Sequence, residues 1–190
     1  MGKEIIGAFS VAIALLSGII YLIQIYRRTI KPHMFSWLVW SILMAIGFAA
    51  QHVEKAGPGA WAMGAGAFIA FTVTGMSFFY GEKHITRGDW AAFIVALSAI
   101  PLWLATSNPL SAVIIVTLVD ILAFYPTFRK SWIKPEEEGM LVFFMGGMQF
   151  FLSVAALENI TLTTALYPVV ITAMNMSLVL MLLYRRQELR

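Results

Sequence analysis

The stretch LIQIYRRTIKP, residues 22–32, ends a long apolar run and leads into a second one. A related stretch, YPTFRKSWIKP, occupies residues 125–135, and aligning residue 22 with residue 125 gives a gap-free offset of 103. Ile30-Lys31-Pro32 then matches Ile133-Lys134-Pro135, and Arg27 matches Lys130. Because both stretches end an apolar run in basic residues, we interpret them as two copies of one structural element.

The composition around these two stretches is that of a membrane protein. Hydrophobic residues make up 60% of the chain and charged residues only 12%, against about 25% charged in soluble domains. A helix crosses the hydrocarbon layer with roughly 20 mostly apolar residues. Charged residues separate seven such runs, which predicts an all-α integral membrane protein with spans near residues 5–26, 34–51, 60–80, 90–106, 108–128, 139–157 and 161–184.

The basic residues predict the orientation of these spans. Eleven of the thirteen Lys and Arg residues fall in alternate connections on one side, and only Lys3 and Lys55 fall on the other. Since Lys and Arg stay in cytoplasmic loops, we expect an outside N-terminus and a cytoplasmic C-terminus, in a bacterial inner membrane. These charges are not gathered on one surface with aromatic residues between them, which argues against a nucleic-acid partner.

The offset of 103 also predicts the domain organisation. The first three spans align with the last three, and the fourth span remains as a linker. We therefore expect a three-helix bundle over 1–81, a linker helix within 82–107 and a second bundle over 108–190. The linker is needed because three spans that start outside end inside. Parallel repeats related by an axis along the membrane normal are an established plan for transporters.

Two motifs carry a resemblance to a known family. IQIYRR at 23–28, followed by SWLVW at 36–40, resembles the PQ-loop signature, in which a Pro-Gln pair ends a helix, basic residues follow and a Ser-Trp region opens the next helix. PTFRK at 126–130 resembles the same element, and the two copies keep half of the pair each, Gln24 and Pro126. The layout is similar to SWEET sugar facilitators, PQ-loop amino-acid exporters and Pnu-type vitamin transporters. That likeness implies a SWEET-like fold with Gln24 and Pro126 at a gate or hinge.

One charged residue lies inside an expected span. Asp120 falls near the middle of the fifth span, where an isolated charge costs about 2.5–3.5 kcal/mol on insertion scales. Such residues usually face a cavity, and Asp120 could carry a coupled proton. The alternative is a protonated carboxyl that hydrogen-bonds a neighbouring helix. Its partner at the offset is Ser17, also polar and also in the middle of a span.

Other polar and aromatic residues complete the expected binding site. Asn175 lies in the seventh span, its partner at the offset is Thr72, and Gln149 lies in the sixth. These residues either grip a substrate or hold helices together by hydrogen bonds. Trp40 could form an aromatic wall of the site or belong to an interfacial belt. Trp37 is expected in that belt, with Trp61, Trp90 and Trp132 at other span ends.

The remaining chemical groups indicate no metal or cofactor. The chain has no cysteine, and His33, His52 and His84 fall in three different loops, where we expect solvated side chains. The acidic triplet 136–138 is expected to open the sixth helix, where carboxylates are favoured by the helix dipole. No Gly-rich phosphate loop and no Ser/His/Asp constellation occurs, so ATP-driven transport and enzyme activity are not expected.

Two functions remain open from the sequence. The first is a secondary transporter or facilitator that moves a small polar solute (sugar, amino acid or vitamin-like) by alternating access between two helix bundles. The second is a membrane receptor or accessory subunit with the same fold but without transport. The expected partners are the solute and the lipid bilayer, and homo-oligomerisation stays open.

Overall fold

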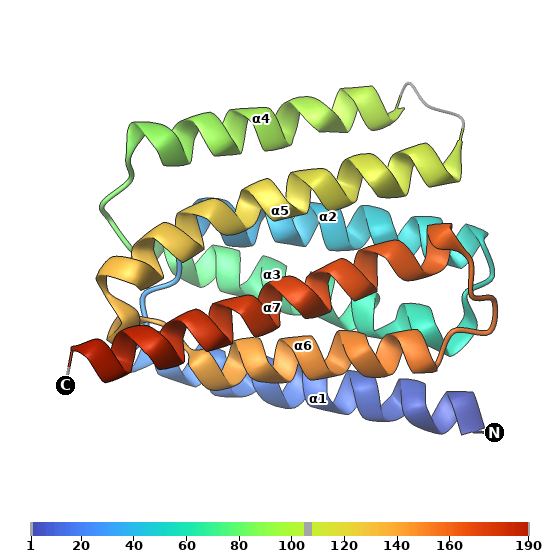
Figure 1. The fold of residues 1–190 in the computed structure, drawn as a ribbon, viewed down its shortest axis with the longest axis horizontal. Coiled ribbons are helices and arrows are strands. Elements are labelled where there is room, and N and C mark those ends of the chain that lie inside the picture. Colours follow the sequence, from blue (N-terminus) through green and yellow to red (C-terminus); the bar gives the residue numbers. More distant parts are fainter. Residues whose placement is uncertain (1, 105–107, 190) are drawn as a thin grey trace.

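The computed structural model describes residues 2–104 and 108–189, and within these residues it is helical without strands. The long helices lie side by side, with the two chain ends at opposite ends of the molecule (Figure 1). Their bounds are α1 (Gly2–Tyr26), α2 (Met34–Val53), α3 (Trp61–Tyr80), α4 (Arg87–Leu104), α5 (Pro109–Ile133), α6 (Met140–Ala155) and α7 (Leu162–Glu188). Two short 3-10 helices, η1 (Gly57–Ala60) and η2 (Pro135–Glu137), precede α3 and α6.

Five of the described helices are long and apolar enough to cross a bilayer: α1, α2, α3 with η1, α5 and α7. Their outer faces carry large apolar side chains, such as Phe68 and Phe79, which are 71% and 78% exposed. These helices fit a multi-pass membrane protein, because lipid rather than water can solvate such faces. Helix α6 is apolar but shorter. Spanning by α4 and α6 stays a prediction, and residues 105–106 of the expected fourth span lie outside the described residues.

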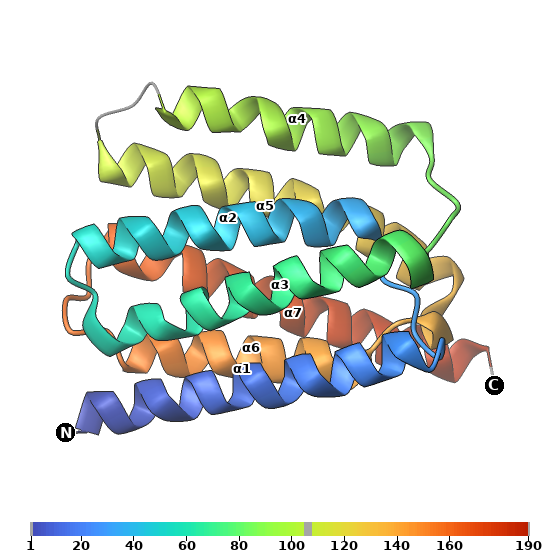
Figure 2. The same cartoon turned by 180° about the vertical axis from the view of Figure 1, so that it is seen from behind.

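The helices pack in two similar groups. Helix α3 packs against both α1 and α2, and α7 packs against both α5 and α6. Between the groups, α1 contacts α6 and α2 contacts α5. Each of these contacts has a counterpart when α1, α2 and α3 are matched with α5, α6 and α7. For example, the contact of α1 with α6 corresponds to that of α5 with α2. Helix α4 lies at the edge of the molecule, mainly against α5, in both views (Figures 1 and 2).

Side-chain capping fixes the start of two helices, α5 and α7. The Asn108 side chain accepts hydrogen bonds from Leu110 N and Ser111 N at the start of α5. Thr161 and Thr164 form a reciprocal capping box at the start of α7. Such side chains satisfy backbone N–H groups that lack partners in the first turn.

The connection between α5 and α6 differs from the sequence-based expectation. Helix α5 continues to Ile133, beyond the expected end at residue 128, so Arg129 and Lys130 belong to its last turns. Helix α6 begins only at Met140, after η2. The acidic triplet therefore does not open α6. The buried, paired Glu138 of this triplet is held by tertiary contacts rather than by a helix dipole.

His33 also differs from the expectation of a solvated loop side chain, because it is fully buried. Its Nε2 lies 3.4 Å from Asp89 Oδ2. Arg129 holds the same carboxylate through two hydrogen bonds, of 3.0 and 2.7 Å. Burial lowers the pKa of His33 despite the neighbouring Asp89. Asp89 therefore joins the connection between α1 and α2 to the start of α4, and Arg129 joins both to the end of α5.

Candidate functional site

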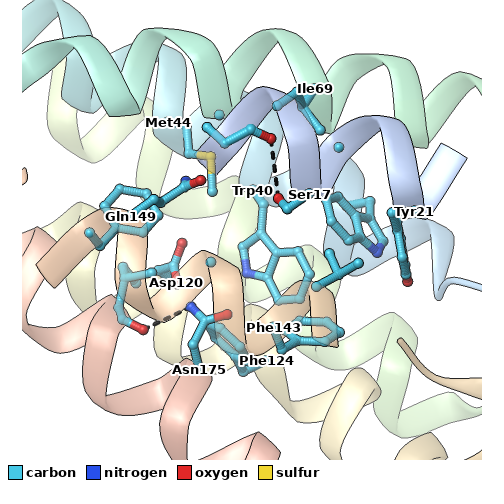
Figure 3. A pocket seen from close by; sticks show the side chains of 18 residues that line it. Ser17, Tyr21, Trp40, Met44, Ile69, Asp120, Phe124, Phe143, Gln149 and Asn175 are labelled. Atoms are coloured by element: carbon cyan, nitrogen blue, oxygen red, sulfur yellow. Dashed lines mark hydrogen bonds between the residues drawn. The ribbon is translucent and has the colours of Figure 1, made fainter. Parts of the chain in front are cut away.

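A cavity with about 70 Å³ of free space lies between the two groups of helices. One half of its lining comes from α1, α2 and α3, and the other half comes from α5, α6 and α7 (Figure 3). The lining residues are Ala14, Ser17, Gly18, Tyr21, Trp37, Trp40, Met44, Gly66, Ile69, Asp120, Phe124, Val142, Phe143, Gly146, Gln149, Phe150, Ile171 and Asn175. A single water needs about 10–15 Å³ on this scale, so the space admits several waters or a small solute.

Asp120 is the only acidic residue in this lining. Its carboxylate is 1% exposed, and Oδ1 accepts a hydrogen bond of 2.9 Å from the Tyr167 hydroxyl. Its second oxygen, Oδ2, has no hydrogen-bond partner among the described residues. A buried polar atom left in this way is costly unless something else occupies the space beside it. The carboxylate is therefore half satisfied by the protein and half available to the cavity.

Three further polar side chains line the cavity: Ser17, Gln149 and Asn175. The Asn175 amide donates a 2.8 Å hydrogen bond to Ile171 O, and its own Oδ1 faces Gly146, where a Cβ would approach it to 3.0 Å. Ser17 donates to Ala14 O at 3.1 Å. Figure 3 shows Asp120, Gln149 and Asn175 on one side of the Trp40 indole. The cavity thus offers carboxylate, amide and hydroxyl oxygens from four helices.

Aromatic rings form much of the remaining lining. The Trp40 ring centroid lies 4.7 Å from that of Phe124 and 5.2 Å from that of Trp37. Trp37 in turn lies 5.0 Å from Tyr21. The interfacial belt expected for Trp37 is wrong, because this side chain is only 8% exposed and lines the cavity. The other three tryptophans expected in the belt, Trp61, Trp90 and Trp132, are 44–51% exposed.

Thr72 does not share this site. Its hydroxyl donates to Phe68 O of its own helix at 3.0 Å, and the residue is absent from the lining. A threonine can satisfy its hydroxyl within its own helical turn, whereas the longer Asn175 side chain reaches the cavity. The expectation that both residues face the cavity therefore holds for Asn175 and not for Thr72.

Three pairs of residues related by the offset of 103 line the cavity together. They are Ser17 with Asp120, Tyr21 with Phe124, and Trp40 with Phe143. Equivalent positions of the two halves therefore face the same space. The two halves differ in an ionisable group at one of these pairs, because Ser17 on α1 corresponds to Asp120 on α5.

A buried ion pair lies between the cavity and one end of the molecule. At this end α1, α3, α5 and α7 terminate and most of the Lys and Arg residues lie, and we call it the basic end. The Tyr21 hydroxyl, on the cavity wall, donates a 2.6 Å hydrogen bond to Glu138 Oε1. Lys130 Nζ lies 2.9 Å from Glu138 Oε2 and also donates to the carbonyls of Lys31 and Glu137, each at 2.7 Å. Lys130 and Glu138 are 2% and 1% exposed. This cluster, which we call the Tyr21–Glu138–Lys130 latch, joins α1 to α5 and to the start of α6.

Two further ion pairs lie at the same end. Lys31 Nζ lies 2.7 Å from Glu137 Oε1, and Lys134 Nζ lies 2.9 Å from Glu82 Oε2. Lys31 thus reaches a glutamate of the second half, and Lys134 reaches a glutamate in the connection that follows α3. Burial raises the pKa of Glu82, but hydrogen bonds from the His84 backbone and from Lys134 outweigh burial and lower it to about 2.

The two prolines of these segments are held in a similar way. Glu82 N donates to Pro32 O at 3.0 Å, just after α3 ends. Arg186 Nη2, near the end of α7, donates to Pro135 O at 2.8 Å and to Glu138 O at 2.7 Å. The end of the third helix of each half therefore holds the Ile-Lys-Pro segment of the same half.

The two residues expected at a gate or hinge lie near this end. Gln24, in the last turns of α1, has a buried side-chain oxygen, and a Cβ on Gly139 would come within 3.4 Å of that oxygen. Pro126 is buried within α5, which continues as a helix on both sides of it. Its missing N–H removes one helical hydrogen bond. Gln24 therefore lies where the two halves meet. Pro126 lies just after Phe124 of the cavity wall, about two turns before the end of α5 at Ile133.

The opposite end of the bundle is joined across the halves by hydrogen bonds, including three from neutral side chains. Gln51 Nε2 of α2 donates to Thr164 O of α7 at 3.0 Å, and Ser153 of α6 donates to Gly59 O at 2.9 Å. Ser10 of α1 donates to Gln149 O at 2.7 Å. The ammonium group of Lys3 on α1 adds another by donating to Leu157 O, just after α6, at 2.6 Å.

The sequence analysis missed the latch. Lys130 was noted as the partner of Arg27 at the offset and Glu138 as part of an acidic triplet, and neither was connected with Tyr21. The available signal was the proximity of opposite charges in the segment RKSWIKPEEE at 129–138. It could not point to Tyr21, which is 117 residues from Glu138 in the chain.

No protein-family model, no curated protein and no solved structure matches this chain. Any function assigned to it therefore depends on its own residues. Three features decide it: the Asp120 carboxylate with one unpartnered oxygen, the aromatic cavity around that carboxylate, and the contacts that join the two halves at each end.

Proposed function

We propose that this protein is a small secondary transporter or facilitator that exposes the central cavity to each side of a membrane in turn. The observation that carries the proposal is the cavity itself, which the two helix groups line in equal shares and into which the buried Asp120 presents an oxygen without a partner. Polar residues buried at membrane depth commonly mark a substrate or ion pathway.

The arrangement of the helices supports a SWEET-like interpretation with seven spans. The contacts among α1–α3 have counterparts among α5–α7, and α4 packs outside both groups. Three residue pairs at the offset of 103 line one cavity. We accordingly propose two parallel three-helix bundles joined by α4, with the basic end on the cytoplasmic side. Rocking of one bundle against the other would open one end while the other stays closed.

The contacts at the basic end support a role for it as the cytoplasmic gate. The Tyr21–Glu138–Lys130 latch joins the cavity wall of one bundle to the other bundle. The ion pair of Lys31 with Glu137 adds a further link between the halves, and that of Lys134 with Glu82 joins the end of α5 to the connection that follows α3. Opening this end requires the bonds between the halves to break together, because they join the same two bodies. The loss of these links must be offset by contacts of the open state or by a ligand that binds that state more tightly.

The second candidate function, a receptor or accessory subunit without transport, shares the fold but not the movement. A cysteine placed in the cavity separates the two, because the natural chain has no cysteine. Ser17→Cys is expected to react with a membrane-impermeant maleimide from both faces, tested in right-side-out and inside-out vesicles. The matched control is Thr72→Cys, which lies outside the cavity and is expected to stay unlabelled from either face. Labelling of Ser17→Cys from one face only would favour the receptor.

Asp120 is the residue through which a proton gradient would act on transport. It is the only carboxyl group of the cavity lining. Asp120→Asn keeps the shape and a hydrogen bond but cannot ionise. In a proton-coupled transporter this change is expected to abolish uphill uptake into liposomes and to leave exchange of bound solute. Wild-type uptake that ignores an imposed pH gradient would show a facilitator instead.

A further inference from the structure

The charge of the cavity restricts what can occupy it. Its lining contains one carboxylate, Asp120, and no Lys, Arg or His. An anionic solute would meet the Asp120 carboxylate with no basic group to offset the repulsion. A neutral solute suits only the protonated form of Asp120. Beside the ionised form it would leave a buried charge without a counter-charge, which is strongly unfavourable in a site of low dielectric. A cation is the solute that complements the ionised carboxylate.

The aromatic rings restrict the kind of cation. Tyr21, Trp37, Trp40, Phe124 and Phe143 surround the same space. The faces of such rings attract a cation within about 6 Å of the ring centroid, and Trp does so best. Replacing a hydration shell by aromatic carbon suits a weakly hydrated organic ammonium group. A metal ion with a tightly held shell needs many oxygen ligands, and among the described residues no three His, Asp or Glu side chains gather for one.

The remaining polar atoms indicate a second feature of the ligand. Trp40 Nε1 is a buried donor without a hydrogen-bond partner among the described residues. Since indole N–H only donates, its natural complement is a hydroxyl or carbonyl oxygen on the ligand. The free space of about 70 Å³ is well below the roughly 300–1,000 Å³ of sites for drug-sized molecules. The ligand is therefore small.

We infer that the cavity binds a small organic cation that carries a hydroxyl or carbonyl oxygen, with Asp120 Oδ2 as the counter-ion and Trp40 as the principal aromatic contact. The inference deepens the proposed function, on which it rests for the movement of the ligand across a membrane. Binding itself requires only the cavity, so it is measured separately from transport.

The experiment uses the purified full-length protein in lipid nanodiscs and labelled choline as the probe. Choline is an ammonium alcohol, and 3,3-dimethyl-1-butanol is its neutral analogue of the same shape. We expect saturable choline binding, with at least tenfold weaker competition by the neutral alcohol. We expect NaCl at equal concentration not to compete. Tetramethylammonium, which lacks the hydroxyl, is expected to bind more weakly than choline because Trp40 Nε1 stays unpaired.

Three variants assign the binding to the named residues. Asp120→Asn and Trp40→Leu are each expected to weaken choline binding at least tenfold. Thr72→Val is the matched control, because Thr72 is a polar residue of the same bundle outside the cavity, and we expect it to bind choline as the natural chain does. Each variant is first checked for a single sharp melting transition. The comparison of choline with its neutral analogue on the natural chain needs no variant and stands if one fails to fold.

Several results would overturn the inference. They are no saturable choline binding up to about 10 mM, equal binding of the neutral alcohol, equal competition by Na⁺, or full binding by a folded Asp120→Asn variant. Choline binding without two-sided labelling of Ser17→Cys would support the ligand class and refute transport. Two-sided labelling without discrimination between choline and the neutral alcohol would support transport and refute the ligand class.

Discussion

Lys130 and Glu138 form an ion pair of 2.9 Å in which both side chains are almost completely buried. Each charge is also held by other groups. The ammonium donates to two backbone carbonyls, and the carboxylate accepts from the Tyr21 hydroxyl and from Gly139 N. Such complete satisfaction is what makes a buried ion pair tolerable, since both desolvation penalties must be offset locally.

Removing one member of this pair is expected to destabilise the protein more than removing both. Lys130→Met or Glu138→Gln leaves the other group without its counter-charge, which typically costs about 3–5 kcal/mol. The double variant Lys130→Met with Glu138→Leu leaves no buried charge and is expected to unfold at a higher temperature than Lys130→Met. Thermal unfolding in nanodiscs checks the order. Glu188→Gln, in an exposed pair with Arg185, is the control and should leave the melting temperature unchanged. Additive losses in the double variant would contradict the coupling.

Tyr21→Phe is expected to loosen the cytoplasmic gate without unfolding the protein. The change removes one hydroxyl that donates to Glu138 Oε1, a loss of about 1 kcal/mol, or roughly fivefold in population. In the Ser17→Cys background, labelling from the cytoplasmic face should rise by about this factor. The control is Tyr26→Phe, because Tyr26 lies exposed at the end of the same helix. An unchanged labelling rate would show that the latch does not limit opening.

The pair of Glu82 with Lys134 is expected to make stability depend on acid pH. The folded-state pKa of Glu82 is about 2, below its ordinary value of 4.5. A depressed pKa contributes stability above the unfolded value, so this contribution is present above about pH 4.5 and is lost as the pH falls towards 2. The melting temperature of the natural chain should therefore fall over that window more steeply than that of Glu82→Gln. Parallel curves for the two proteins would contradict this.

Gly81 is expected to tolerate no side chain. A Cβ at this position would lie 2.6 Å from Ser77 O and 2.7 Å from Pro32 O, both backbone atoms that cannot move alone. Gly81→Ala should lower stability by about 1–3 kcal/mol, since overpacking displaces the segment at Pro32. Gly75 provides the control within α3, because a Cβ there meets no atom within 4 Å. Gly75→Ala should leave the melting temperature unchanged or raise it, and equal losses at both sites would refute the steric explanation.

The proposed orientation predicts which ends of the helices face the cytoplasm. Thr29 is exposed in the connection between α1 and α2 at the basic end, and His52 is exposed near the end of α2 at the opposite end. Thr29→Cys should react with an impermeant maleimide only in inside-out vesicles, and His52→Cys only in right-side-out vesicles. The reverse pattern would invert the topology, and labelling of both from one face would refute the spanning of α2.

The sequence by itself determined the helical membrane class, the approximate helix positions and much of the cavity. Apolar runs of about 20 residues between charges suffice to predict helices. Polar residues in the middle of such runs stand out against their surroundings. For that reason Ser17, Trp40, Asp120, Gln149 and Asn175 were all predicted as site residues, and all of them line the cavity.

Only the tertiary structure decided which side chains meet. Trp37 and Thr72 were assigned from their depth in a span, but the rotation of a helix about its axis decides whether a side chain faces lipid, its own backbone or the cavity. Helix rotation is set by packing against neighbours distant in sequence, as α1 packs on α6. The latch illustrates the same limit, because Glu138 becomes buried only when Tyr21, Lys130 and Arg186 arrive from three different helices. Local sequence carries the charge and the polarity of a residue, and long-range packing determines its partner.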